Sequence, residues 1–494
     1  MKRSSAQPRV VSTPLQRWTF LVVISLGLLM IGVDNSILYT ALPQLREQLA
    51  ATETQGLWII NAYPLVLSGL LLGTGTLGDR IGHRLMFLLG LALFGLASLG
   101  AAFSPTAWSL VAARGLLGLA AAVMLPATLA LVRITFTDER ERNTAVGVWA
   151  SIAVLGAAAG PVVGGLLLEH FWWGSVFLIN VPIVAVALIA TCAIAPPNVP
   201  NPAKRWDAVS SGFALVALSG LVLAIKEGVN PDRSWLVLSI ALASAILAGI
   251  AFTHRQRRLD DPLLAFDVFA SRIFTGGVSA AAAAMFVVAG LELMTTQRYQ
   301  LVAGYSPLDA GLLVISVTLA AFPFSILGGA MLHRVGFLPL IAGGFAAIAL
   351  GVALAAWFSH QGWLSGFVAS LLLVGAGAGS TMSVSSTAII GGAPVHRAGM
   401  AAGVESVSYE FGTLISVAVL GSLLPVLYAG VTPVGTAGML AALDDPTTAA
   451  TAGAAYDRAY LTILMILAGF AAAMASVTAW CFRGNPKGAA VAHQ

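Results

Sequence analysis

Residues 21–43 read LVVISLGLLMIGVDNSILYTALP, an apolar run long enough to cross a membrane as one helix. A carboxylic acid, Asp34, lies inside this run. Because an Asp at mid-bilayer costs about 2.5–3.5 kcal/mol on insertion scales, an acid inside a span indicates a function. Asp34 is therefore the first candidate functional residue, and the rest of the chain supplies its setting.

The composition is that of an all-α polytopic membrane protein. Of 494 residues, 58% are hydrophobic and 9% are charged, against about 25% charged residues in an average soluble domain. Apolar runs of about twenty residues recur from end to end. The basic N-terminus leads straight into a full span, so no cleavable signal peptide is expected. Neither a disulfide framework nor a cysteine metal site is expected from Cys192 and Cys481, which both lie in predicted spans.

Hydropathy predicts fourteen spans, an even number that places both termini on one side of the membrane. The predicted spans lie near residues 18–40, 56–77, 85–103, 108–132, 143–168, 174–195, 207–226, 235–253, 273–302, 309–331, 337–358, 364–390, 399–428 and 459–482.

The distribution of Lys and Arg indicates the orientation. Most of the 25 Lys and Arg residues fall in loops on the side of the termini, and one, Arg114, falls inside a span. The loops on the other side hold Arg46, Lys226, Arg233, Arg298 and Arg458. This bias predicts cytoplasmic termini. Because the basic residues lie in short loops between spans, the net charge of +4 is no reason to expect a nucleic-acid partner.

Two hairpins show an internal repeat. Residues 75–82 read GTLGDRIG and residues 329–336 read GAMLHRVG, with Gly, Arg and Gly at the same spacing. The repeat predicts a six-helix bundle in residues 1–200, two inserted helices in residues 201–265 and a second six-helix bundle in residues 266–494. Repeats of this kind place a substrate site between the halves, near the membrane midplane.

Four acids and one arginine lie in the predicted apolar interior: Asp34, Glu292, Glu405, Glu410 and Arg114. Facing lipid they would cost on the order of 10 kcal/mol, so they are expected to line a cavity or to pair with one another. A carboxylate shielded from water can hold a proton, and an approaching cation favours its ionised form, so proton and cation compete for one site. The alternative is that some of these acids only pair with Arg114 or cap a helix break.

Spacing separates the roles of these charges. Glu405 and Glu410 are five residues apart, about 140° around a helix, so they cannot both point straight into one cavity. Arg114 is expected to tune a neighbouring acid, with Asp34 the first choice. The alternative for Arg114 is a side chain that snorkels from a helix end to the membrane surface.

Two glycine-containing motifs indicate moving parts. The hairpin at residues 75–84 is interpreted as a latch between helices on the cytoplasmic face, or else as an ordinary basic loop. Its residues of interest are Gly75, Asp79, Arg80, Gly82 and Arg84.

The glycines and the proline of the fifth span allow close helix approach and a kink, which suits a rocking interface or simple packing. Its residues of interest are Gly156, Gly160, Pro161, Gly164 and Gly165.

Aromatic side chains near the spans, among them Trp58, Tyr63 and Tyr409, are candidates to stack on a flat organic cation, with packing as the alternative. The sequence has no Walker loop, nucleophile motif or histidine cluster with metal spacing. We therefore expect no enzyme activity, no metal site and no cofactor.

These motifs together resemble the major facilitator superfamily. Residues 75–84 are similar to its signature loop, Arg114 with Gly118 to its fourth-helix motif, and residues 156–165 to its antiporter motif. The stretches VDNSILYTALP (residues 33–43), LWIINAYPL (57–65) and FLINVP (177–182) are similar to signatures of the fourteen-helix drug/proton antiporters, close to the QacA-like and SmvA-like multidrug efflux pumps.

The resemblance implies two six-helix bundles, alternating access and efflux of lipophilic cations such as quaternary ammonium compounds, biguanides, dyes and methyl viologen in exchange for protons. Asp34, Glu405 and Glu410 match acidic positions of these pumps. Asn61 and Ala321 stand where some relatives carry acids, so the set of acids is reduced; Glu292 is a partial substitute, and Asn61 is placed in the substrate cavity.

The resemblance thus implies a monomeric, proton-coupled multidrug exporter of the bacterial inner membrane, whose partners are lipophilic cations, protons and membrane lipid. The alternative function is proton-coupled export of one metabolite, amino acid or antibiotic on the same fold.

Overall fold

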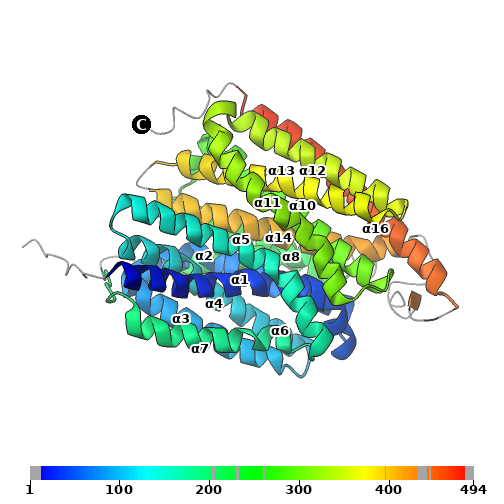
Figure 1. Cartoon of the computed structure of the whole chain (residues 1–494), viewed down its shortest axis with the longest axis horizontal. Helices are drawn as coiled ribbons and strands as arrows, with labels where there is room; N and C mark the ends of the chain where they lie inside the picture. Colours follow the sequence, from blue (N-terminus) through cyan, green and yellow to red (C-terminus); the bar gives the residue numbers. More distant parts are fainter. Residues whose placement is uncertain are drawn as a thin grey trace, which may run out of the picture.

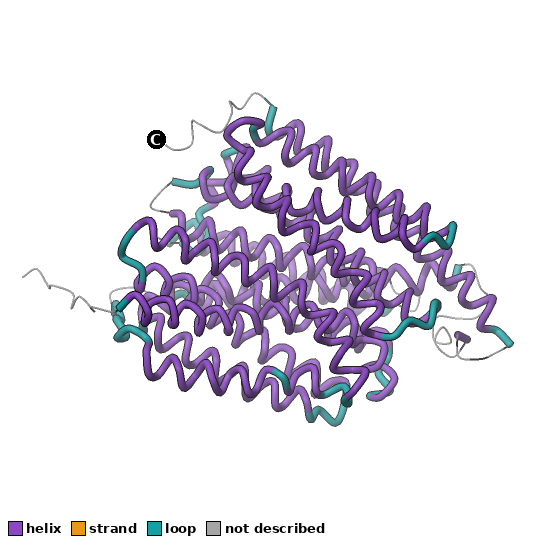
Figure 2. The backbone as a smooth tube through the Cα atoms, in the orientation of Figure 1, coloured by secondary structure: helices purple, strands orange, loops and turns teal. Residues whose placement is uncertain are grey.

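The structure, a computed structural model, describes residues 13–202, 206–229, 233–259, 262–394, 397–430, 442–443, 445 and 447–483. Within these residues all regular structure is helical and there is no strand (Figure 2).

The first part of the chain forms α1 (Pro14–Gln48), α2 (Glu53–Ile81), α3 (His83–Ala102), α4 (Ala107–Thr135), α5 (Glu139–His170), α6 (Ser175–Leu178) and α7 (Asn180–Ile194). A hairpin of α8 (Ala208–Val229) and α9 (Trp235–Gln256) follows. The last part forms the 3₁₀ helix η1 (Phe266–Ala270), then α10 (Arg272–Leu301), α11 (Pro307–Val335), α12 (Phe337–His360), α13 (Leu364–Gly391), α14 (Ala398–Ala429) and α16 (Ala449–Cys481).

The helices are those of a multi-pass membrane protein. Among the described residues, 12 helical segments are long and apolar enough to span a membrane, or 13 if α2, bent between Leu71 and Gly73, is one span. The prediction of fourteen spans is therefore not confirmed, and α5 is the long helix that remains outside this count.

Side-chain caps fix where several helices begin. Thr13, Thr52 and Thr106 each accept a hydrogen bond from the backbone N–H three residues later, at the starts of α1, α2 and α4. In each case the side chain at that third position bonds back to the capping residue. These reciprocal bonds satisfy backbone donors that the first turn of a helix leaves free.

The repeated hairpins adopt the same backbone geometry. Gly82 ends α2 with φ +99° and Gly336 ends α11 with φ +87°. The N–H of each glycine donates to the carbonyl four residues earlier at 2.8 Å. Since side chains disfavour positive φ, glycine is required at both turns. In Figure 1, α3, α4 and α7 lie in the lower part and α11, α12 and α13 in the upper part, with α14 level with α5. We call α1–α7 the first half and α10–α16 the second half.

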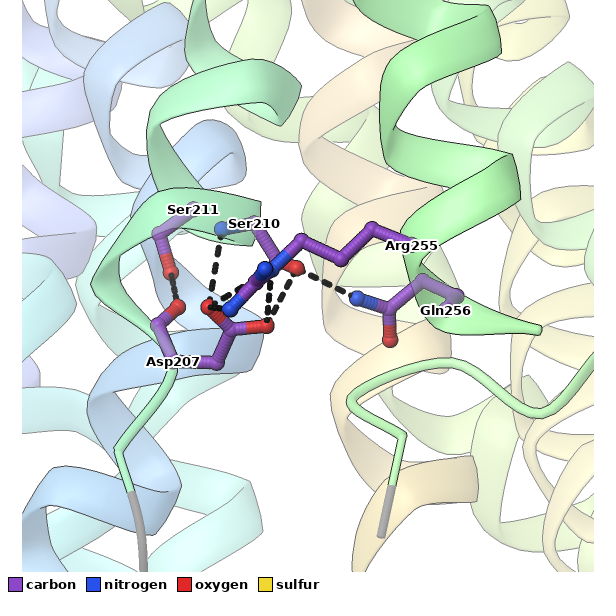
Figure 3. A network of polar contacts seen from close by, with 5 residues as sticks. All are labelled: Asp207, Ser210, Ser211, Arg255 and Gln256. Carbon is purple, nitrogen blue, oxygen red and sulfur yellow. Dashed lines mark hydrogen bonds and ion pairs between the residues drawn. The ribbon is translucent and has the colours of Figure 1, made fainter. Parts of the chain in front are cut away.

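The α8–α9 hairpin is closed by a polar network at the end where α8 begins (Figure 3). Asp207, just before α8, accepts hydrogen bonds from Arg255 Nε and Nη2 at 3.0–3.1 Å. Gln256 Nε2 donates to Ser210 Oγ at 2.6 Å. Burial alone would raise the pKa of Asp207, but hydrogen bonds from Arg255 and Ser210 outweigh it and hold this pKa below its usual range. The network therefore ties the two helices together.

The inserted helix α8 packs against both halves, touching α2 on one side and α14 on the other. On α2, a Cβ at Gly69 would lie 2.9 Å from Leu215 Cα, and one at Gly73 would lie 1.9 Å from Ser211 Oγ. Only glycine allows α8 to approach α2 this closely. The hairpin therefore covers the line along which α2 meets α14.

Direct contacts between the halves gather at the end of the bundle opposite the start of α1 (Figure 1). Thr296 Oγ1 on α10 donates to the Tyr39 carbonyl on α1 at 3.0 Å, and Gln300 Nε2 donates to the Thr40 carbonyl at 3.1 Å. Close to the start of α11, a Cβ at Gly311 would lie 2.5 Å from the Pro161 carbonyl oxygen of α5. The halves are therefore joined at this end.

Candidate functional site

A buried ion pair lies inside the first half. Asp34 and Arg114 have no exposed side-chain surface, and Arg114 Nη1 donates to Asp34 Oδ2. Asn180 Nδ2 lies 3.2 Å from the other oxygen of Asp34 and 3.3 Å from Ser98 Oγ. Four helices, α1, α3, α4 and α7, thus converge on one carboxylate.

Neutral groups of α2 surround the rest of Arg114. Its Nε donates to the Ile59 carbonyl at 3.2 Å, and its Cζ lies 4.6 Å from the centre of the Tyr63 ring. This contact depends on Gly118, because a Cβ there would lie 2.4 Å from the Tyr63 carbonyl oxygen. Arg114 is fully buried, so the snorkelling alternative is wrong. Asp34 is the one carboxylate that pairs with it among the described residues.

Glu410 reaches this pair from the other half. The side chain of Asn35, next to Asp34 on α1, hydrogen-bonds to Glu410 on α14, and Arg114 acts on the same carboxylate electrostatically. Glu410 Oε2 has no hydrogen-bond partner among the described residues. We call the set Asp34, Asn35, Arg114, Asn180 and Glu410 the central polar cluster. It spans the boundary between the halves.

Glu292 and Glu405 lie around this cluster. Glu292, half-buried on α10, acts electrostatically on Tyr39 of α1, and within the described chain its carboxylate takes part in no ion pair. Glu405 Oε1 is 3.2 Å from the Tyr409 hydroxyl, which is also 3.2 Å from the Met382 carbonyl on α13. Glu405 therefore points toward α13 while Glu410 points toward α1, as their spacing predicts.

Two α2 residues hold unused hydrogen-bonding groups. Asn61 is fully buried, and neither atom of its side-chain amide has a partner in the described part of the chain. The Tyr63 hydroxyl is unpartnered in the same way. An unsatisfied buried polar group costs about 1–3 kcal/mol, so these atoms are available to water or a ligand.

Trp58 lies in a different setting. It packs with Leu65 of α2, Val222 of α8, and Leu414 and Ala418 of α14, a set called the Trp58 cluster below. The Lys226 Nζ lies 4.3 Å from the centre of the Trp58 ring. Trp58 thus already contacts a cation that belongs to the chain.

The hairpin at residues 75–84 contacts its own half. The Asp79 carboxylate lies 3.0 Å from His83 Nε2, Arg84 Nη2 donates to the Cys192 carbonyl at 3.1 Å, and Asn198 Nδ2 donates to the Ile81 carbonyl at 2.7 Å. The bonds to Cys192 and Asn198 hold the hairpin against α7 and the segment that follows it. The role of the hairpin as a latch stays a prediction. Of its other residues, Gly82 makes the turn, Arg80 is exposed and Gly75 lies near Pro126.

The glycines of α5 face two helices. A Cβ at Gly160 would lie 1.9 Å from Ser36 Oγ of α1, and one at Gly165 would lie 2.4 Å from Leu308 Cα of α11. Toward α1 lie Gly156, Gly160 and Gly164, whereas Gly165 and Pro161 lie against α11. The helix α5 is therefore packed closely on its own half and on the other half at once.

Sequence reasoning assigned no role to Asn35, Ser98 or Asn180. Asn35 lies in the stretch VDNSILYTALP and Asn180 in the stretch FLINVP. The similarity of these stretches to family signatures was the feature that could have pointed to both residues. Nothing in the sequence marked Ser98. Among the described residues no group of three or more His, Cys, Asp or Glu side chains is placed to hold a metal ion.

Comparison with known proteins gives concordant results. The family model described as "Major Facilitator Superfamily" matches residues 24–417. The "Methyl viologen resistance protein SmvA" of Salmonella typhimurium is 39% identical over 416 residues, 83% of each chain. The "Multidrug efflux pump LfrA" of Mycolicibacterium smegmatis is 35% identical over 502 residues, 96% of this chain and 98% of its own.

A third relative is named for a single compound. The "Tetracenomycin C resistance and export protein" of Streptomyces glaucescens is 32% identical over 414 residues, 82% of this chain and 76% of its own. One similar solved structure is that of a bacterial homolog of the human lysosomal transporter Spinster, in an inward-facing and unoccupied conformation. It matches with a TM-score of 0.66 at 15% sequence identity, over 95% of this chain and 98% of the other. At that identity the match shows the fold alone.

Proposed function

This chain belongs to the major facilitator superfamily, and from that premise we propose that it is a proton-coupled exporter of lipophilic cations. Its relatives named for multidrug efflux and methyl viologen resistance support drug efflux across a membrane. Protons as the coupling ion and organic cations as the substrate class are the proposed part.

The observation that carries the proposal is the charge balance of the central polar cluster together with the nearby Glu292. Arg114 compensates Asp34, but Glu410 and Glu292 have no cationic partner of their own in the described chain. A site with more acids than bases attracts a cation or takes up protons. The two ligands would therefore replace each other there, which is the requirement for exchange.

The packing supports alternating access. With the predicted cytoplasmic termini, the end at which the halves are joined faces outward, so this conformation would be open to the cytoplasm. The glycines of α5 let it slide against α1 and α11 with few side chains in the way. We also propose that α5 is a span, which with the bent α2 would complete the predicted fourteen.

A second candidate is export of one compound. The relative named for tetracenomycin C export favours it, since that protein is 32% identical to this chain over 82% of its length. The central polar cluster favours cations instead, because its uncompensated groups are acids.

A vesicle assay tests the proposal. In everted vesicles with an acidic interior, addition of methyl viologen or tetraphenylphosphonium should dissipate the pH gradient in wild type and not in Asp34→Asn. Glu47→Gln, an exposed acid-to-amide change on the same helix, is the control and should behave as wild type. Loss of the gradient with a neutral antibiotic and not with cations would support the second candidate, and no response to either would reject both.

A further inference from the structure

Lys226 is a buried lysine without an anionic partner among the described residues. It lies in the last turn of α8, where a lysine ordinarily extends to the membrane surface, and the sequence placed it in an outer loop. Instead the residue is only 7% exposed, and its Nζ has no hydrogen-bond partner among the described residues. The adjacent acid does not compensate it, because the Glu227 carboxylate accepts a bond from the Ser234 backbone N–H.

The contact that Lys226 does make is with the Trp58 ring, 4.3 Å from its centre. The rest of the Trp58 cluster is aliphatic, contributed by α2, α8 and α14. A cation over the face of Trp is stabilised by about 0.5–1 kcal/mol when exposed and by about 2 kcal/mol or more when desolvated. Trp58 therefore offers a cation site of the kind that organic cations use, and Lys226 occupies it.

The Trp58 cluster lies between the halves. It sits on the line along which α2 meets α14, and a Cβ at Gly421 of α14 would lie 2.3 Å from the Leu57 side chain of α2. This close contact lies toward the same end as the other contacts between the halves. A cation that reached Trp58 would meet an aromatic face that the Lys226 side chain already covers.

We propose that Lys226 is a specificity-determining residue whose terminal amino group covers the face of Trp58 and so prevents a cationic substrate from binding there. The inference rests on the proposed function, because it assumes a cationic substrate. It adds a role for the α8–α9 hairpin: α8 carries a side chain that keeps one aromatic site closed.

Equilibrium binding of tetraphenylphosphonium to the purified, full-length protein tests this. Lys226→Ala frees the Trp58 face and should lower the dissociation constant by about 2- to 30-fold, the range that cation–π energies give. A second binding site would be an equivalent result. Lys226→Arg keeps a cation on the ring and should bind as wild type does. In the double variant Lys226→Ala with Trp58→Leu the gain should disappear.

The outcomes separate the two proposals. Wild-type binding with no gain in Lys226→Ala, or a gain that persists without Trp58, would overturn the inference and leave the proposed function standing. No binding by any variant would overturn both. Should Lys226→Ala fail to yield monodisperse protein, Lys226→Met, which keeps the length of the side chain, replaces it with the same expected direction.

Discussion

Removing the charge of Asp34 should destabilise the protein strongly, because it leaves Arg114 buried without a counter-charge. The remaining contacts of Arg114 are the neutral Ile59 carbonyl and the Tyr63 ring, so no second acid within the described chain forms an ion pair with it. Breaking a buried pair by removing one partner costs about 3–5 kcal/mol. Asp34→Asn and Arg114→Met should each lower the free energy of unfolding by that amount.

A double-mutant cycle isolates the pair. The variant that carries both changes leaves neither member of the pair as an unpaired charge, so it should lose less than the sum of the single changes by about 0.5–3 kcal/mol. The assay is reversible denaturant unfolding of purified protein, with exposed Glu47→Gln as a control expected within about 0.5 kcal/mol of wild type. Single losses below about 1 kcal/mol together with an additive double variant would refute the buried pair.

Two further results follow from the packing and from the pKa of Asp207. Gly160→Val should abolish transport in the vesicle assay, because a Cβ at Gly160 would lie 1.9 Å from Ser36 Oγ. The control Gly343→Val should keep transport, because a Cβ at this position on α12 would have no atom within 4 Å. Transport by Gly160→Val would contradict close packing of α5 on α1. Hydrogen bonds from Arg255 and Ser210 lower the pKa of Asp207 although burial opposes them. The ionised carboxylate therefore stabilises the folded protein at pH values above its unfolded-state pKa of about 4. This stabilisation is lost as the pH falls through the lower pKa of the folded state. The thermal stability of wild type should therefore exceed that of Asp207→Asn at neutral pH, with the difference shrinking in acid; a constant difference would exclude this linkage.

The membrane class, the repeated turn and the position of Asp34 inside a long apolar helix were open to prediction because they depend on local sequence. Runs of apolar residues define the helices, and the glycines at positions 82 and 336 recur because both turns need positive φ. The opposite directions of Glu405 and Glu410 followed from the helical period. Each of these features is set within one helix or one turn.

Features that depend on how helices meet were not predictable. The bond between Asn35 and Glu410 joins α1 to α14, and its register comes from the packing of the halves. Lys226 was expected in an outer loop because lysines at span ends ordinarily reach water. The Lys226 side chain is buried because α8 packs between α2 and α14. The hydropathy pattern of the sequence does not indicate this packing.

Proton release from the purified, detergent-solubilised protein tests competition between cation and proton most directly. In weak buffer between about pH 6 and 8, tetraphenylphosphonium should release protons from wild type and not from Asp34→Asn. Unchanged release in Asp34→Asn would show that exchange at Glu292 and Glu410 does not depend on Asp34. Absence of release from wild-type protein that binds the cation would contradict cation/proton exchange.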